Sequence, residues 1–134
     1  MAYTADAVSL LTYLVDALPP TADRLFAEAE AGETLLRAPS TALSEVLYAV
    51  SRDKDVRGVT LSGSPETARR ALVDNGPVSV APVGESELAE YAALVSAFSI
   101  HDGLIVASHR SVGTEAIVTS DGVIRDAGYD TVWE

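Results

Sequence analysis

Hydrophobic positions along the chain alternate between short strand-like runs and longer stretches with helical spacing. Leu10, Leu11, Leu14 and Leu18 recur at helical spacing after a weak strand, Ala2–Ala5, and Pro19-Pro20 stops that helix. Further strands are predicted at Thr34–Ala38, Val78–Val83, Glu115–Thr119 and Thr131–Trp133. An alternation of strands and helices is typical of an α/β fold with a largely parallel sheet.

Capping and turn-forming residues mark the other helices. Thr21 is placed to cap a second helix that leaves at Gly32, and Ser64-Pro65-Glu66 combines a cap, a first-turn proline and an acid. The run from Ser99 to Asp102 has the spacing of a capping box before a long helix. The remaining segments are predicted as helices at 40–50 and 86–98 and a loop at 53–63.

The composition fits one domain over residues 1–134 and excludes several chemistries. Of the 134 residues, 48% are hydrophobic, which is enough for a core. The absence of cysteine excludes disulfides, thiolate zinc sites, iron–sulfur clusters and cysteine nucleophiles. No apolar run approaches the ~18 residues that span a bilayer, and Met1–Asp6 lacks a signal-peptide pattern, so a cytoplasmic protein without a membrane partner is expected.

Acidic residues dominate the charge. The chain has 20 Asp and Glu against 9 Lys and Arg, a formal charge of -11, and Lys54 is its only lysine. Such a surface stays solvated in concentrated salt, which favours a halophilic source. The same charge argues against broad nucleic-acid binding, which depends on basic patches, so any nucleic-acid role must depend on a local site.

Four acids fall where the strands of a parallel sheet should end. They are Asp6 after the first strand, Glu45 early in the helix after the second, Asp102 in the first turn of the long helix, and Asp121 after the strand Glu115–Thr119. Each also has a structural interpretation, as a helix cap for Asp6 and Asp102, a surface residue for Glu45 and a turn for Asp121. Sites in parallel sheets lie beyond the carboxyl ends of the strands, so the four together favour a site.

Carboxylates that converge repel one another, and desolvation increases the cost. Either some of them bind protons or a cation neutralises them, and no lysine lies near any of the four in the sequence. Mg²⁺ and Mn²⁺ suit carboxylate and water ligands. Such an ion activates water and stabilises charge that builds on a phosphate, so the residues favour the hypothesis of metal-assisted phosphodiester hydrolysis.

Four segments resemble the motifs of the PIN-domain family. They are an opening strand with the first acid at 3–11, an acidic helix at 41–47, a motif with the third acid at 99–108, and a terminal strand with the fourth acid at 118–121. Their order and spacing match over nearly the whole chain. The size suits the small prokaryotic members, which include VapC-type toxins.

This resemblance implies a three-layer α/β/α sandwich with a central parallel sheet of four to five strands. It also implies Mg²⁺- or Mn²⁺-dependent ribonuclease activity, in which Asp6, Glu45, Asp102 and Asp121 are the metal-binding and catalytic residues. In the toxin branch of the family the substrate is RNA, a small antitoxin blocks the site, and the toxins commonly form homodimers.

One position departs from the family pattern. The family usually has a small hydroxyl residue two positions after the first Asp, where this chain has Val8, and Thr119 is an alternative source of a hydroxyl. Asp126 is a fifth, weaker candidate for a metal-binding acid. His101 and His109 are read as ordinary polar residues, with substrate contact by His101 as the alternative; they are eight apart and do not fit a helical zinc pair.

Two arginines, Arg52 and Arg110, are candidates for phosphate contact, with stabilisation of helix C-termini as the alternative. Other enzyme classes lack their signatures: GxxxxGK[ST], GxGxxG and GxSxG are absent, and the acids and lysine do not fit a receiver domain or a haloacid-dehalogenase-type phosphatase. The remaining alternative is a catalytically inactive PIN-like module that acts by binding another protein.

Overall fold

Five parallel strands form the central sheet of the computed structural model, which describes residues 1–134. They are β1 (Ala2–Ala5), β2 (Leu35–Pro39), β5 (Val78–Ala81), β6 (Ala116–Val118) and β7 (Thr131–Val132), in the spatial order β5-β2-β1-β6-β7. Every neighbouring pair is parallel, so all five carboxyl ends lie at one edge. This confirms the predicted sheet.

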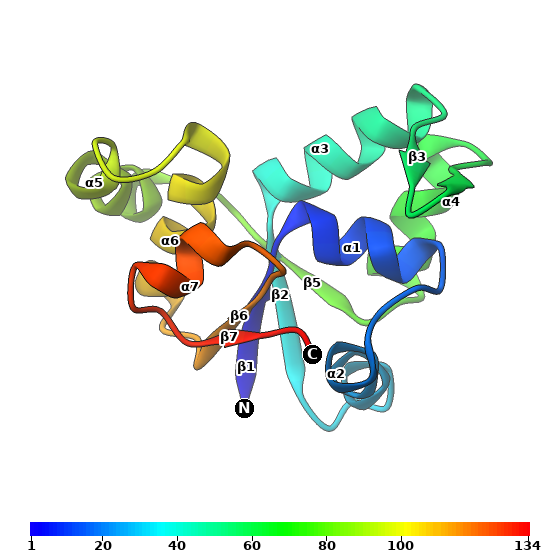
Figure 1. The fold of residues 1–134 in the computed structure, drawn as a ribbon, viewed down its shortest axis with the longest axis horizontal. Coiled ribbons are helices and arrows are strands. Elements are labelled where there is room, and N and C mark those ends of the chain that lie inside the picture. The colour runs from blue at the N-terminus through cyan, green and yellow to red at the C-terminus, as the bar shows by residue number, and fades with distance from the viewer.

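Helices cover both faces of the sheet and make the predicted three layers (Figure 1). The helical segments are α1 (Ala7–Leu14), α2 (Pro20–Glu30), α3 (Ser40–Ser51), α4 (Pro65–Arg69) with a π-helical turn η1 (Arg70–Asp74), α5 (Glu85–Leu94), α6 (Ile100–Val112) and α7 (Gly122–Asp126). Figure 1 shows α5, α6 and α7 on one side of the sheet and α1 to α4 on the other. The chain reverses its winding direction between β1 and β6, the adjacent strands from which connections leave in opposite directions.

Alternating strand residues supply a core on each face. On the side of α1 and α2, Leu10, Phe26 and Leu36 are at most 1% exposed, and the ring of Phe26 stacks on that of Tyr13 at 4.9 Å. On the side of α6 and α7, Ile117 packs with a smaller apolar cluster. Burying each such large side chain contributes roughly 1.5–3 kcal/mol, so the two cores fix the sheet between them.

The first two helices differ from the sequence prediction at their ends. The first ends at Leu14 rather than at Leu18, because Asp16 adopts a left-handed φ of 55° that a helix cannot continue through. Leu18 still packs against the core. The second helix begins at Pro20, with Pro19 at the N-cap instead of Thr21. Pro20 suits the first helical position, because the N–H that it lacks would have no partner within the helix there.

Two elements were not predicted from the sequence. The segment 53–63 contains a hairpin of β3 (Asp55–Val56) and β4 (Val59–Thr60) instead of a loop throughout. Its two turn residues, Arg57 and Gly58, have φ of 50° and 81°, as the tight turn of a two-residue hairpin requires. The other is the short helix α7, which follows Asp121 where a turn alone was expected.

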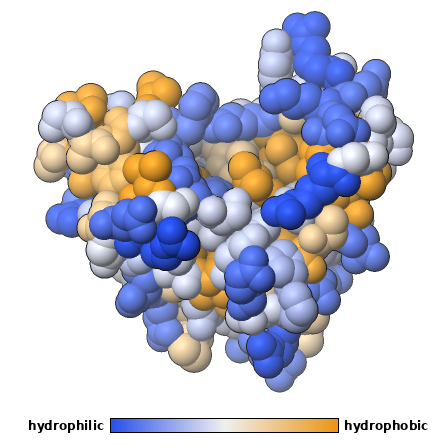
Figure 2. All heavy atoms as spheres, viewed as in Figure 1, coloured by the Kyte–Doolittle hydropathy of each residue, from blue (hydrophilic) through white to orange (hydrophobic).

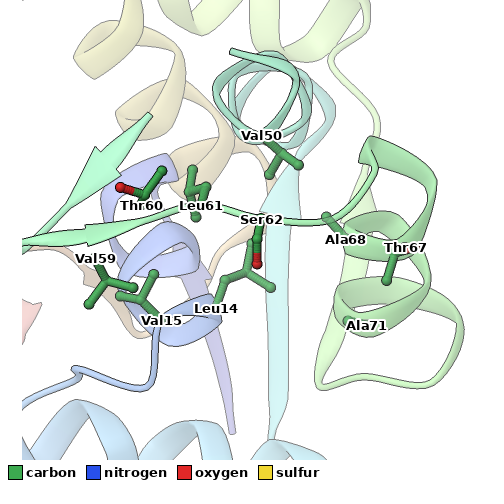
Figure 3. Close-up of a pocket in the computed structure, with 10 residues that line it drawn as sticks. All are labelled: Leu14, Val15, Val50, Val59, Thr60, Leu61, Ser62, Thr67, Ala68 and Ala71. Atoms are coloured by element: carbon green, nitrogen blue, oxygen red, sulfur yellow. The ribbon is translucent and has the colours of Figure 1, made fainter. Parts of the chain in front are cut away.

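An apolar pocket of about 180 Å³ lies between α1, α3, β4 and α4 (Figure 3). Leu14 and Val15 line it from one side, and Val50, Leu61 and Ala68 line it from the others. None of the four candidate acids is among its lining residues. The pocket therefore belongs to the packing of this end of the molecule and not to the candidate site.

Polar and apolar side chains share the surface unevenly. Figure 2 shows apolar atoms over the α5–α6 end and along the hollow that separates this end from α1 and α3, while polar atoms cover most of the rest of that face. Single exposed apolar residues are normal on a protein surface.

A membrane-spanning helix would need greater length and hydropathy than any helix of this structure has.

Gly103 lets α5 approach α6 directly beside Asp102. A Cβ at this position would lie 2.5 Å from Cε1 of Tyr91. We predict that Gly103→Ala destabilises the fold by about 1–2 kcal/mol, because the clash exceeds the gain in helix propensity. In a Tyr91→Ala background the same change should stabilise by up to about 1 kcal/mol. Urea unfolding of the four proteins measures this, and the same sign in both backgrounds would contradict the packing described.

Candidate active site

Asp6 lies at the end of β1 and caps α1. Its Oδ1 accepts a hydrogen bond of 2.8 Å from the backbone N–H of Ser9, and its Oδ2 accepts one of 2.5 Å from the hydroxyl of Thr119. The residue is only 8% exposed. Burial raises the pKa of Asp6, and although the hydrogen bonds from Thr119 and Ser9 act in the opposite direction, burial is the larger effect.

Thr119 supplies the hydroxyl that the sequence lacks at position 8. Val8 is 47% exposed at the rim of the pocket that contains Asp6 and offers no hydrogen bond. Thr119 is 2% exposed, donates to Asp6 and accepts a 3.0 Å hydrogen bond from the backbone N–H of Asp121. One threonine therefore connects the acid after β1 with the acid after β6.

Asp102 lies in the first turn of α6. The hydroxyl of Ser99 caps this helix by accepting a 3.3 Å hydrogen bond from the backbone N–H of Asp102, as predicted. The pKa of Asp102 is raised to about 6, first by burial and then by the hydrogen bond and the negative charge of Asp121, with a smaller contribution from the charge of Asp6. The hydroxyl of Ser99 lowers it in part. Asp102 is therefore electrostatically linked to two other acids.

Asp121 occupies the N-cap of α7, where its Oδ1 accepts a 2.8 Å hydrogen bond from the backbone N–H of Val123. Its negative charge raises the pKa of both Asp6 and Asp102. The structural interpretation of Asp6 as a helix cap is thus correct, whereas Asp121 caps a short helix instead of forming a turn alone. Both carboxylates lie in the same cluster as well.

Glu45 reaches the same place from α3. Together with Asp6 and Asp102 it lines a pocket of about 140 Å³ at the carboxyl edge of the sheet, and Val8 and His101 line the pocket too. Glu45 Oε1 lies 2.6 Å from Nδ1 of His101. This pair could not be predicted from the sequence, because residues 56 apart give no local signal.

The acid cluster thus brings together the four predicted residues, but not as a formed metal centre. No three His, Asp or Glu side chains are placed to hold one ion as the structure stands. The donor set itself fits Mg²⁺ or Mn²⁺, since it consists of carboxylate oxygens, two of them on groups whose pKa is raised by burial and like charge. The Oε1 atom of Glu45 is engaged by His101, so this oxygen is not free for an ion while the pair is formed.

The weaker candidates lie elsewhere. Asp126, at the end of α7, is exposed and accepts a 3.3 Å hydrogen bond from its neighbour Arg125. Arg110 pairs with Glu90 at 2.7 Å, and Arg52 stacks on the ring of Tyr48 at 4.9 Å. None of these residues lines the pocket that contains Asp6, Glu45 and Asp102.

Without a metal ion, Asp102 should make the fold less stable as the pH rises. Its pKa is higher in the folded chain, at about 6, than the ordinary 3.8, so its stabilising contribution is complete below pH 3.8 and is lost as the pH rises through about 6. We predict that Asp102→Asn in EDTA is more stable than the parent at pH 7 by on the order of 1 kcal/mol, after allowance for solvent screening, and that this gain shrinks towards pH 4. Urea unfolding at the two pH values, with Glu28→Gln as a charge-matched control on α2, is the measurement. A pH-independent difference would contradict the electrostatic origin.

Thr119→Val should disturb Asp6 in a way that Thr119→Ser does not. The valine keeps the shape but removes the donor to Asp6, which should raise the pKa of Asp6 further, whereas serine keeps the hydroxyl. We predict that Mn²⁺ raises the melting temperature of the valine variant by less than half the shift of the parent, with an intermediate or full shift for serine. Equal Mn²⁺ shifts in all three proteins would show that the hydroxyl does not prepare Asp6.

Comparisons with known proteins identify solved structures that share this fold. No protein-family model matches the chain, and no curated protein matches its sequence. The structure is similar to that of VapBC2 from Rickettsia felis bound to a DNA fragment from their promoter, with a TM-score of 0.74 and 14% sequence identity, and to that of VapC20 from Mycobacterium tuberculosis, a Sarcin-Ricin loop cleaving toxin, with a TM-score of 0.67 and 22% identity. Both comparisons cover all of this chain and all of the other. The chain therefore has the fold of the VapC PIN-domain toxins.

Proposed function

We propose that the chain is a Mg²⁺- or Mn²⁺-dependent endoribonuclease that hydrolyses RNA phosphodiester bonds, and that it serves as the toxin of a toxin–antitoxin pair. The observation that carries the proposal is the convergence of Asp6, Glu45 and Asp102 around one pocket, with Asp121 beside them in the adjoining pocket, at the carboxyl edge of the sheet. These acids come from four separate parts of the chain. A purely structural role would not require a cluster that raises the pKa of its own members.

The chemistry follows from what the carboxylates do. Asp6 and Asp102 carry raised pKa values because the protein leaves much of their desolvation and repulsion uncompensated, so they favour a bound cation. A bound Mg²⁺ or Mn²⁺ would supply an activated water and would stabilise the charge that develops on the phosphate. The hydrogen bonds from Ser9 and Thr119 hold Asp6 in one orientation, so this ligand needs little rearrangement.

The remaining acids differ in how firmly they are held. Asp121 is fixed by its bond to Val123, whereas Glu45 is 38% exposed and is retained by His101, which is itself 66% exposed. We assign Asp6, Asp102 and Asp121 as ligands whose charges already influence one another and which would adjust further to close around an ion. Glu45 is assigned as the ligand that joins them when His101 releases it.

The partners follow from the same likeness. The Mycobacterium protein is described as a toxin that cleaves the Sarcin-Ricin loop, and the Rickettsia structure as VapBC2 on promoter DNA. By analogy we propose for this chain an RNA substrate, a cognate antitoxin that blocks the acid cluster, and a homodimer. The proposal treats residues 1–134 as a single PIN-like domain that works in the cytoplasm.

A catalytically inactive interaction module is the second candidate. The observation that favours it is the Glu45–His101 pair, which withdraws one acid from the cluster and leaves no formed three-ligand centre. Such a module would not bind a divalent ion at these acids. Metal binding therefore separates the two candidates.

We predict that Mn²⁺ raises the melting temperature of the parent and that Asp102→Asn loses most of this shift, because an ion that binds only the folded chain stabilises it. Glu28→Gln removes one negative charge from the exposed face of α2 and should keep the full shift. Scans in low and in high salt separate specific binding from general screening. Equal shifts in all three proteins, or none, would favour the interaction module.

Asp6→Asn should lower the rate of RNA cleavage by at least about 100-fold, because it removes a metal ligand, and should leave metal-free stability equal or higher. The assay uses total RNA and a Sarcin-Ricin loop oligonucleotide with Mg²⁺ or Mn²⁺, and Glu28→Gln is the control. If Asp6→Asn cleaved as fast as the parent, the assignment of Asp6 would be wrong. If the parent and Glu28→Gln both failed to cleave any RNA, the proposed activity would be wrong.

A further inference from the structure

A second pocket, of about 340 Å³, adjoins the acid cluster on the side of β7. Seven of its eight lining residues are polar or charged, and the eighth is a tryptophan; they are Arg57, Thr119, Ser120, Asp121, Arg125, Thr131, Trp133 and Glu134. Two residues connect this pocket with the acid cluster. Thr119 lines the pocket and hydrogen-bonds to Asp6, and Asp121 lines the pocket and is itself one of the four acids. A ligand in the second pocket would therefore lie next to the acids.

The pocket brings together two of the few basic residues of the chain. Two of the nine basic residues meet here, Arg57 from the β3–β4 hairpin and Arg125 from α7. Elsewhere, Arg69, Arg70 and Arg110 are engaged by glutamate or aspartate partners at 2.7–3.1 Å, and within the pocket Arg125 pairs at 3.3 Å with its exposed neighbour Asp126. Asp121 and Glu134 bring negative charge to the same pocket, but Asp121 is one of the proposed metal ligands.

Several contacts fix the frame of the pocket. The backbone carbonyl of Trp133 accepts a 3.1 Å hydrogen bond from Ala22, and Thr119 donates its N–H to Val132 at 3.2 Å. The ring of Trp133 packs partly against the core, and the guanidinium of Arg57 lies 5.6 Å from its centroid. This cation–π contact holds the hairpin turn over the end of the sheet. Arg57 is thus oriented before any ligand arrives.

We propose that this polar pocket binds a backbone phosphate of the RNA strand, next to the phosphate that is cleaved at the acid cluster. The inference rests on the proposed ribonuclease function and assigns part of its substrate site. A guanidinium presents a planar set of donors that matches phosphate oxygens, and the hydroxyls of Ser120 and Thr131 add further donors. A purely structural role, in which Arg57 stabilises the hairpin through Trp133, would account for the position of Arg57. It would not account for Arg125, which lines the same pocket from another element.

The test is RNA binding without cleavage. In an Asp102→Asn background without added metal, a fluorescein-labelled oligouridylate is titrated by anisotropy at several salt concentrations. Arg57→Gln and Arg125→Gln should each weaken binding about fivefold and lower the slope of log Kd against log salt by about 0.7, the value for one phosphate contact on a single strand. Arg70→Gln, the same charge change on a residue outside the pocket, should leave both quantities unchanged.

The outcomes separate the subsite from the function. Equal losses in all three variants would show a general charge effect and would overturn the subsite, as would no binding by the Asp102→Asn parent up to millimolar RNA. Cleavage by the wild-type chain is then judged separately, so that the ribonuclease proposal stands or fails on its own assay. If Arg57→Gln lowers the melting temperature, Arg125→Gln, which breaks no stacking contact, decides the question. In the cleaving chain the same substitutions should raise KM more than they lower kcat.

Discussion

The constraint on which this structure depends is the free-energy cost of bringing carboxylates together at a partly buried edge of the sheet. Asp6 accepts two hydrogen bonds that favour its charged form, yet burial still raises its pKa. Asp102, with fewer such bonds and two acidic neighbours, reaches a pKa of about 6. The fold therefore maintains an arrangement that opposes its own stability, and two apolar cores have to offset it.

Those cores also determine where the acids lie. Ala5 and Val118 are partners in the parallel register of β1 and β6, and both are fully buried. The residues that follow, Asp6 on one strand and Thr119 on the other, consequently leave the sheet side by side and meet through a hydroxyl. A slip of one residue in either strand would turn a buried side chain outwards and separate this pair. Core packing and site geometry are thus consequences of the same register.

The sequence predicted the parts of this arrangement that depend on local patterns. Strand runs, the cap at Ser99 and the acids at strand ends or in first helical turns all follow from nearby residues, and the structure places Asp6, Glu45 and Asp102 around one pocket. The hairpin escaped prediction because its turn uses Arg57 before Gly58, and an arginine seldom adopts a positive φ. The Glu45–His101 pair joins α3 to α6 and can be found only once the chain is folded.

Net charge and local charge act over different distances in this molecule. With a formal charge of -11, the chain as a whole repels RNA, but at 0.1 M salt that repulsion decays over about 10 Å. Inside that distance Arg57 and Arg125 are the cations beside Asp121. If the proposed function is right, an RNA strand binds this end of the sheet more tightly than the rest of the surface only when its phosphates reach the acids and the two arginines together. The acidic surface then acts against non-specific RNA contacts, and the local site supplies the discrimination.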